Sequence, residues 1–213
     1  MKEENIKAIT VKAFKPKTTD SLGTIAAPNL LAEIKLEECA PAKIIIGDIT
    51  YIRLRGGKFC YLAVWQDKVT RRVIGWSLAL EMTAELVISA LKKAIRKGLV
   101  KAGAIVHSDR GSQYASIAFR ELLGRNGFQQ SMSGKGNCYD NAQAESFFSR
   151  FKAELMENGV FEDFDQARSE IFSYIEGYYN RIRLHSSLGY KSPLEFEMEL
   201  QIKNGGIKRE FFV

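Results

Sequence analysis

The sequence predicts an α/β fold built on a mixed β-sheet. Three runs rich in β-branched and aromatic residues, at 43–54, 58–67 and 71–80, are separated by short turn-forming segments and predict an antiparallel meander. An amphipathic helix and a further apolar strand follow, and a helix between two strands is the usual connection of a parallel pair. The sheet is therefore expected to contain both antiparallel and parallel neighbours.

The remaining elements follow in order along the chain. The stretch 83–98 has apolar residues at helical spacing and ends in glycine, 102–109 predicts the fourth strand, and 116–127 predicts a second helix stopped by glycines. A polar, glycine-spaced loop over 131–140 leads into a longer helix that begins near Asn141. The C-terminal part predicts a helix, a polar turn and a short helix entered through Ser192 and Pro193.

Composition narrows the class of protein. The chain has 213 residues, enough for one large domain, and a net charge of +6 that favours a polyanionic partner without proving one. Three scattered cysteines fit neither a disulfide framework nor a zinc site, which indicates a reducing interior. The sequence shows no membrane span and no signal peptide, so we expect a cytoplasmic, nucleoid-associated protein without a membrane partner.

Three carboxylates stand out by their positions. Asp48 interrupts a strand face that is otherwise mostly apolar, and Asp109 comes where a later buried strand ends. A salt bridge to Arg110, a helix cap or a metal ion could each explain Asp109. Glu145 lies in the long helix and, taken alone, is most simply a solvated residue.

The start of that helix carries its own signal. Asp140 as N-cap and Gln143 three residues later form a capping-box pattern, which places Glu145 in the second turn. Helical spacing then puts Asn141, Glu145 and Lys152 on one face.

If the first and fourth strands are neighbours and the helix packs over them, the three acids converge on one site. Carboxylates brought together repel one another, and a divalent cation removes that repulsion. Ligands that are all oxygen suit Mg²⁺ or Mn²⁺, and two such ions are the arrangement used for in-line phosphoryl transfer. No covalent enzyme intermediate is required.

Five segments together resemble the integrase-core transposases of bacterial insertion sequences, in particular the branch with a second-frame transposase protein. They are "DITYI", "YLAVWQDKVTRRVIGW", "HSDRGSQYAS", "SMSGKGNCYDNAQAESFFSRFKAEL" and "YYNRIRLHSSLGYKSP", and the match runs from about 41 to 198. In that family 35 residues separate the second Asp from the Glu, as they separate Asp109 from Glu145 here. Asn141 matches the family's "DNA-x-x-E" pattern.

The resemblance implies a ribonuclease-H-like (integrase core) fold, a mixed five-stranded sheet flanked by helices. It implies that Asp48, Asp109 and Glu145 form a catalytic triad that binds two Mg²⁺, with Mn²⁺ as a substitute. It also implies DNA cleavage at insertion-sequence ends followed by strand transfer, and a homo-oligomer that brings two ends together.

The resemblance also suggests a division of the chain. Residues 1–42 form an N-terminal arm, the remnant of a DNA-binding region, and 43–158 form the integrase catalytic core. Residues 159–201 form a C-terminal helical extension, and 202–213 a flexible tail. The arm is short for the helix-turn-helix module that usually precedes the core, so a separate helix-turn-helix protein from the same element is a possible partner. Two further departures are Ile45 and Gly134, where the family tends to have Trp and Arg.

Candidate DNA contacts are polar or basic residues near the triad and in the C-terminal segment. His107 could contact DNA or could be a strand-end histidine hydrogen-bonded to the backbone. The donors of the 131–140 loop suit phosphates, although an ordinary surface loop is the alternative. The "YYNRIRLH" segment interleaves aromatic and basic residues, which suits stacking and phosphate binding, or else packs its tyrosines in the core. The candidates are His107, Ser131, Ser133, Lys135, Asn137, Asn141, Lys152, Arg181, Arg183 and His185.

Two other functions remain compatible with these residues. One is a catalytically silent DNA-binding remnant of a transposase, and the other is a ribonuclease-H-like nuclease that acts on RNA–DNA hybrids. The intact set of acids argues against lost chemistry.

Overall fold

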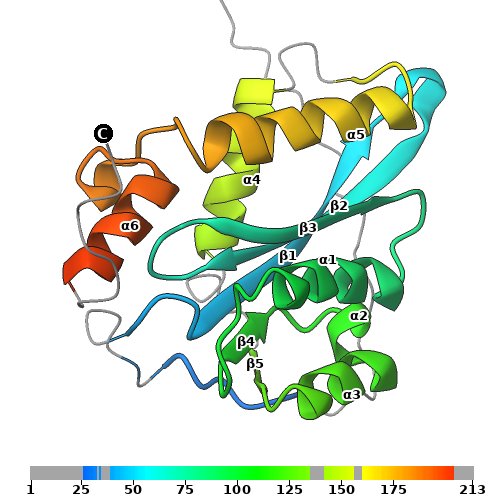
Figure 1. Ribbon diagram of the computed structural model, residues 1–213. Coiled ribbons are helices and arrows are strands. Elements are labelled where there is room, and N and C mark those ends of the chain that lie inside the picture. The colour runs from blue at the N-terminus through cyan, green and yellow to red at the C-terminus, as the bar shows by residue number, and fades with distance from the viewer. Residues whose placement is uncertain (1–25, 33, 35–38, 135–141, 156–159, 204–213) are drawn as a thin grey trace, which may run out of the picture.

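The fold is organised around a five-stranded mixed sheet (Figure 1). The computed structural model describes residues 26–32, 34, 39–134, 142–155 and 160–203. The strands are β1 (Ile44–Arg53), β2 (Phe59–Asp67), β3 (Val73–Ala79), β4 (Ile105–Ser108) and β5 (Gln129–Met132), in the spatial order β3-β2-β1-β4-β5. Pairs β1–β2 and β2–β3 are antiparallel, whereas β1–β4 and β4–β5 are parallel. The predicted mixed five-stranded sheet is confirmed.

Three helices cover one face of the sheet: α1 (Ala84–Arg96), α2 (Ser112–Ala115) and α3 (Ile117–Arg125). Trp65 of β2 lies in the core on this side, where its ring stacks on Phe119 at a centroid distance of 5.8 Å. Its indole nitrogen donates a hydrogen bond of 3.0 Å to the carbonyl of Val87 on α1. The amphipathic pattern that predicted α1 thus packs against the sheet as expected.

The other face is covered by α4 (Ala142–Leu155) and α5 (Phe164–Phe172), which cross over the sheet in Figure 1. Phe147 and Phe151 of α4 pack with Ile171 of α5 against the strands. No helix in the described ranges is long and apolar enough to cross a membrane.

Gly47 allows Trp65 to lie flat against β1. A Cβ atom at position 47 would lie 2.3 Å from an atom of the Trp65 ring, far inside van der Waals contact. The residue before Asp48 therefore has to be glycine for this packing, because β1 and β2 are paired side by side.

The C-terminal part continues α5 as a π-helical turn, η4 (Ser173–Tyr179), followed by the short η5 (Ser186–Leu188) and by α6 (Pro193–Lys203). The Asn180 amide exchanges two hydrogen bonds with the backbone of Val73, of 2.9 and 3.0 Å, and so attaches this segment to the edge strand β3. The predicted start of α6 at Pro193 is confirmed, and Ser192 and Glu195 form a reciprocal capping box there.

Candidate active site

Asp48 lies within strand β1, and Asp109 directly follows the neighbouring parallel strand β4. Strand β1 pairs with β4 so that Ile46 lies opposite His107, and each aspartate is two residues further along. Parallel neighbours in a sheet are about 4.8 Å apart, so the two aspartates lie side by side. Strand β4 ends at Ser108 while β1 continues, so the pair lies where β4 ends, and both side chains are half-buried.

The electrostatics of this pair show that the third acid is near. The pKa of Asp48 is raised from 3.8 to about 7, first by burial and then by the charge of Asp109, with a further contribution from Glu145. A hydrogen bond of 2.8 Å from the Ile49 amide and the charge of Lys152 oppose the rise. The charges of Asp109 and Glu145 therefore both act on the Asp48 carboxyl.

Glu145 lies on the exposed side of α4, away from the phenylalanines that pack in the core. It is close enough to act on Asp48 through space, yet the residues that the structure describes contain no group of three His, Cys, Asp or Glu side chains arranged to hold one metal ion. The two aspartates thus form the fixed part of the site, and Glu145 faces it from the helix.

The predicted capping box of α4 is wrong at Gln143, and Asp140 lies outside the described residues. The Gln143 amide donates to Oε1 of Gln66 at 2.9 Å and to the carbonyl of Asp67 at 3.0 Å, so it is turned into the sheet. The predicted DNA contacts Lys135, Asn137 and Asn141 also lie outside the described residues.

Asp109 is held by its own loop. Its Oδ1 accepts a hydrogen bond of 2.9 Å from the Gly111 amide, and burial raises its pKa more than this bond lowers it. The Arg110 guanidinium turns away and donates to the carbonyl of Ser133 at 2.9 Å. The alternative of a local Asp109–Arg110 salt bridge is therefore not the arrangement found.

His107 is a structural residue, and its expected DNA contact is wrong in this structure. Its side chain is 0% exposed, and its two ring nitrogens lie 2.8 Å from the Ser131 hydroxyl and 3.1 Å from the Ser133 hydroxyl. These two serines were expected to be phosphate donors in a loop, but Ser131 belongs to strand β5 and both are buried. All three residues hold β4 to β5.

Lys152 lies beside the acids on the same flank of α4 as Glu145. Its ammonium group is 4.2 Å from the centroid of the Tyr51 ring. Burial and the charge of Arg53 lower its pKa, whereas Asp48 raises it. The Lys152 ammonium group is therefore close enough to Asp48 for their charges to interact.

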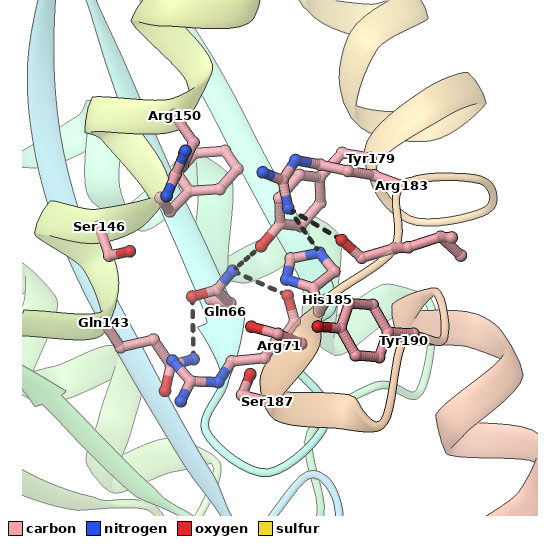
Figure 2. Close-up of a pocket in the computed structure, with 13 residues that line it drawn as sticks. Gln66, Arg71, Gln143, Ser146, Arg150, Tyr179, Arg183, His185, Ser187 and Tyr190 are labelled. Carbon is pink, nitrogen blue, oxygen red and sulfur yellow. Dashed lines mark hydrogen bonds between the residues drawn. The ribbon is translucent and has the colours of Figure 1, made fainter.

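Arg183 and His185 lie apart from the acids, in the wall of a cavity of about 350 Å³ shown in Figure 2. Arg183 forms a bidentate ion pair with Glu154, with a shortest distance of 2.7 Å. Burial, then Arg183 and Arg71, lower the pKa of His185 to about 4, so it is neutral at physiological pH. Arg181 is exposed outside the cavity, and its Nε donates to the carbonyl of Glu176 at 3.0 Å.

Sequence reasoning missed this cavity. The exposed Arg150 lines the cavity with Gln143 and Ser146 of the same helix. Their spacing of three and four residues marks a second polar flank of α4, a signal that the sequence does contain. Arg71 comes from the β2–β3 turn, and its position here depends on tertiary structure alone.

The donor chemistry of the acidic site fits a hard divalent cation. The carboxylates supply oxygen ligands only, and the nearby His107 nitrogens already bind serine hydroxyls. Burial and mutual repulsion both disfavour the ionised form of Asp48, and a cation would reverse both effects. Asp48 and Asp109 are the residues that could hold such a cation, and Glu145 of α4 could add a third oxygen ligand.

Comparison with known families gives two matches that cover most of the described chain. Residues 39–138 match one integrase core domain model and residues 126–193 match a second. The transposase for insertion sequence element IS904 of Lactococcus lactis is 45% identical over 174 residues, covering 82% of this chain and 68% of that protein. Transposase InsF for insertion sequence IS3A of Escherichia coli is 40% identical over 197 residues, covering 92% of this chain and 68% of that protein.

Solved structures agree on the fold. A chain of the simian T-cell lymphotropic virus intasome superposes with a TM-score of 0.61 at 18% identity, over 82% of this chain and 57% of that one. The catalytic core domain of HTLV-2 integrase, in a structure with magnesium, gives 0.52 at 17% identity, over 75% and 97%. These neighbours confirm the predicted ribonuclease-H-like fold. By its relatives and its integrase core, the chain belongs to the insertion-sequence transposases, enzymes of the polynucleotidyl transferase type.

Proposed function

We propose that this chain cleaves DNA at insertion-sequence ends and transfers the strand, with Asp48, Asp109 and Glu145 as its catalytic carboxylates. The observation that carries the proposal is that Asp48 and Asp109 each lie two residues beyond the paired residues Ile46 and His107 of β1 and β4, with the charges of Asp109 and of Glu145 from α4 both acting on Asp48. Family membership supplies the reaction class.

The cofactor in this proposal is Mg²⁺, with Mn²⁺ as a substitute, bound as two ions. Asp48, Asp109 and Glu145 would hold these ions, which would supply activation of the attacking oxygen and stabilisation of the leaving oxygen of a phosphodiester. The two aspartates are held in place because Asp48 lies in β1, Asp109 directly follows β4, and each accepts a backbone hydrogen bond. Lys152 lies beside them and is placed to contact a DNA phosphate.

Each of the two proposed reactions forms one phosphorus–oxygen bond and breaks another. In cleavage, a water oxygen forms a bond to phosphorus, and the ester bond to the 3′-oxygen breaks, leaving a 3′-hydroxyl and a 5′-phosphate. In strand transfer, that 3′-hydroxyl attacks a second phosphodiester, forms a new ester and releases another 3′-hydroxyl. One site serves both steps because only the attacking oxygen changes.

The partners we propose are the ends of the element, target DNA and a second copy of the chain. Two DNA ends have to meet for an element to move, which a homo-oligomer achieves. A separate helix-turn-helix protein from the same element could add end recognition.

The test is nicking and strand transfer on supercoiled and short duplex DNA with Mg²⁺ or Mn²⁺. Asp48→Asn, Asp109→Asn and Glu145→Gln are compared with Glu121→Gln, which changes an exposed acid of α3 on the opposite side of the sheet. We expect activity that requires the metal, is lost in the three site variants and is retained in Glu121→Gln.

Other outcomes would contradict the proposal. DNA binding without cleavage in any protein would favour the silent remnant, and cleavage restricted to RNA–DNA hybrids would favour a nuclease. If all three site variants retained activity, Asp48, Asp109 and Glu145 would not be catalytic.

A further inference from the structure

The cavity on the far flank of α4 is built from three parts of the chain. The β2–β3 turn contributes Arg71, α4 contributes Gln143 and Arg150, and the segment before α6 contributes Tyr190 (Figure 2). On a helix, residues 143, 146 and 150 share one flank, whereas 145 and 152 lie on the opposite one. The cavity is therefore a separate site from the acids, although α4 connects the two.

Backbone strain is concentrated at this cavity. Among described residues other than glycine, three have positive φ angles: Ala42, Arg71 at 62° and Tyr190 at 56°. Two of these three line the cavity. A bulky side chain in the left-handed region costs energy, and such residues cluster at binding sites, where a fixed direction of the side chain is needed.

Arginine side chains bring positive charge to the cavity. Arg150 is exposed and Arg71 half-buried, and neither guanidinium has a hydrogen bond or ion pair with a described residue. Arg183 is already paired with Glu154. Two guanidinium groups in the wall of one cavity suit a phosphate group.

An exposed aromatic ring stands beside these polar groups. Tyr190 is 73% exposed, and the neighbouring Leu184 of the cavity is also exposed. Aromatic rings next to cations are the usual platform for an unpaired base, because every base has a face that can stack. The cavity volume of about 350 Å³ lies within the range of small-molecule sites.

We propose that this cavity binds one unpaired nucleotide, with its phosphate at Arg150 and Arg71 and its base against Tyr190. The inference rests on the proposed function in one respect, that the chain acts on DNA. A base within a duplex cannot enter, so the nucleotide comes from a frayed or single-stranded part of the DNA or is a free nucleotide. An occupied cavity would fix the rotation of α4 and so the direction of Glu145.

The test is fluorescence anisotropy in EDTA with two labelled DNAs of equal length, a blunt duplex and a duplex with a short single-stranded overhang. Arg150→Gln removes an exposed cation, and Tyr190→Gly removes the ring while glycine accepts the positive φ. The matched controls are Arg125→Gln, which changes an exposed arginine on α3, and Tyr190→Phe, which keeps the ring.

We expect wild type to prefer the overhang, and each of the two cavity variants to lose about tenfold in affinity for it. Binding to the blunt duplex should change by less than about twofold, since phosphate contacts elsewhere are kept. The controls should behave as wild type. Equal losses on both DNAs, or no preference in wild type, would overturn the inference.

Competition with dAMP then separates the two sources of the nucleotide. Displacement of the overhang by dAMP supports a site for an isolated nucleotide, and retention supports a nucleotide held within a strand. The proposed function is judged separately by nicking with metal. Nicking without overhang preference would refute the cavity alone, and overhang preference without nicking would refute the catalytic proposal alone.

Discussion

Gln143 on α4 donates a hydrogen bond of 2.9 Å to Oε1 of Gln66 on β2, and both side chains are buried. Gln66 in turn donates to the Tyr179 hydroxyl at 2.8 Å and to the carbonyl of Arg71 at 2.7 Å. One small network therefore ties the start of α4, the sheet and the C-terminal segment together, two residues before Glu145.

Replacing Gln143 by Ala should destabilise the protein. The change leaves Oε1 of Gln66 without its donor, whereas the carbonyl of Asp67 keeps its hydrogen bond from the Arg71 amide. An unsatisfied buried group costs about 1–3 kcal/mol in the free energy of unfolding. Urea denaturation measures the effect. Gln201→Ala, at an exposed position of α6, is the control. Equal stability of the two variants would show that the network contributes nothing.

The pKa of Asp48 predicts an unusual dependence of stability on pH in the metal-free protein. A folded-state pKa of about 7, above the unfolded value of 3.8, means that the folded state binds the proton more tightly. The contribution of Asp48 to stability is therefore fully present below about pH 4 and is lost as pH rises to about 7. The loss is up to about 4 kcal/mol, because one unit of pKa corresponds to about 1.4 kcal/mol.

Urea denaturation in EDTA from pH 5 to pH 8 checks this prediction against Asp48→Asn, which keeps the shape without the charge. We expect the variant to become the more stable protein as the pH rises. Added Mg²⁺ should restore the stability of wild type above pH 7 and leave the variant unchanged. Parallel pH curves for the two proteins would show that the Asp48 carboxyl is not perturbed.

Replacing His107 by Ala should lower stability and leave the DNA affinity of the folded protein unchanged. The variant removes the partner of two buried hydroxyls and leaves a cavity between β4 and β5, at a cost of at least about 2 kcal/mol. Thermal unfolding and DNA binding below the unfolding temperature measure the two properties. A selective loss of DNA affinity, with unfolding as in wild type, would show that His107 contacts DNA.

Alanine at Gly47 and at Gly124 should have opposite effects. The Cβ at position 47 collides with the Trp65 ring, so Gly47→Ala should cost about 1–3 kcal/mol. Gly124 lies in α3 with open space around it, so Gly124→Ala should stabilise by about 0.4–1 kcal/mol. Chemical denaturation of both variants tests the pair, and a loss at both positions would contradict the account of the β1–β2 packing.

Local pattern explains why most of the sheet could be predicted. Strands β1 to β3 are long and apolar, and α1 repeats apolar residues at helical spacing, so each element is encoded by its own residues. Strand β5 has four residues, Gln129–Met132, with no alternation, and it exists because β4 lies beside it. The fifth strand was therefore expected from the family resemblance alone.

The residues of the two sites also differ in how far the sequence alone could predict their positions. Asp48 could be found because a charge in an apolar strand is conspicuous. The serines that bind His107 come more than twenty residues later, and nothing near His107 in the sequence indicates them. Arg71 and Tyr190 meet in one cavity only because the β2–β3 turn and the C-terminal segment pack on each other.

The short parallel pairing of β1 with β4 has a consequence for how the enzyme is made. The β1–β2–β3 meander pairs residues close in sequence and can form early, whereas β1 meets β4 only after about 60 residues of chain have closed into a loop. Asp48 is thus present in the first hairpin long before Asp109 arrives. A nascent or truncated chain cannot assemble the site, so the ability to cut DNA begins only when most of the domain has been synthesised and folded.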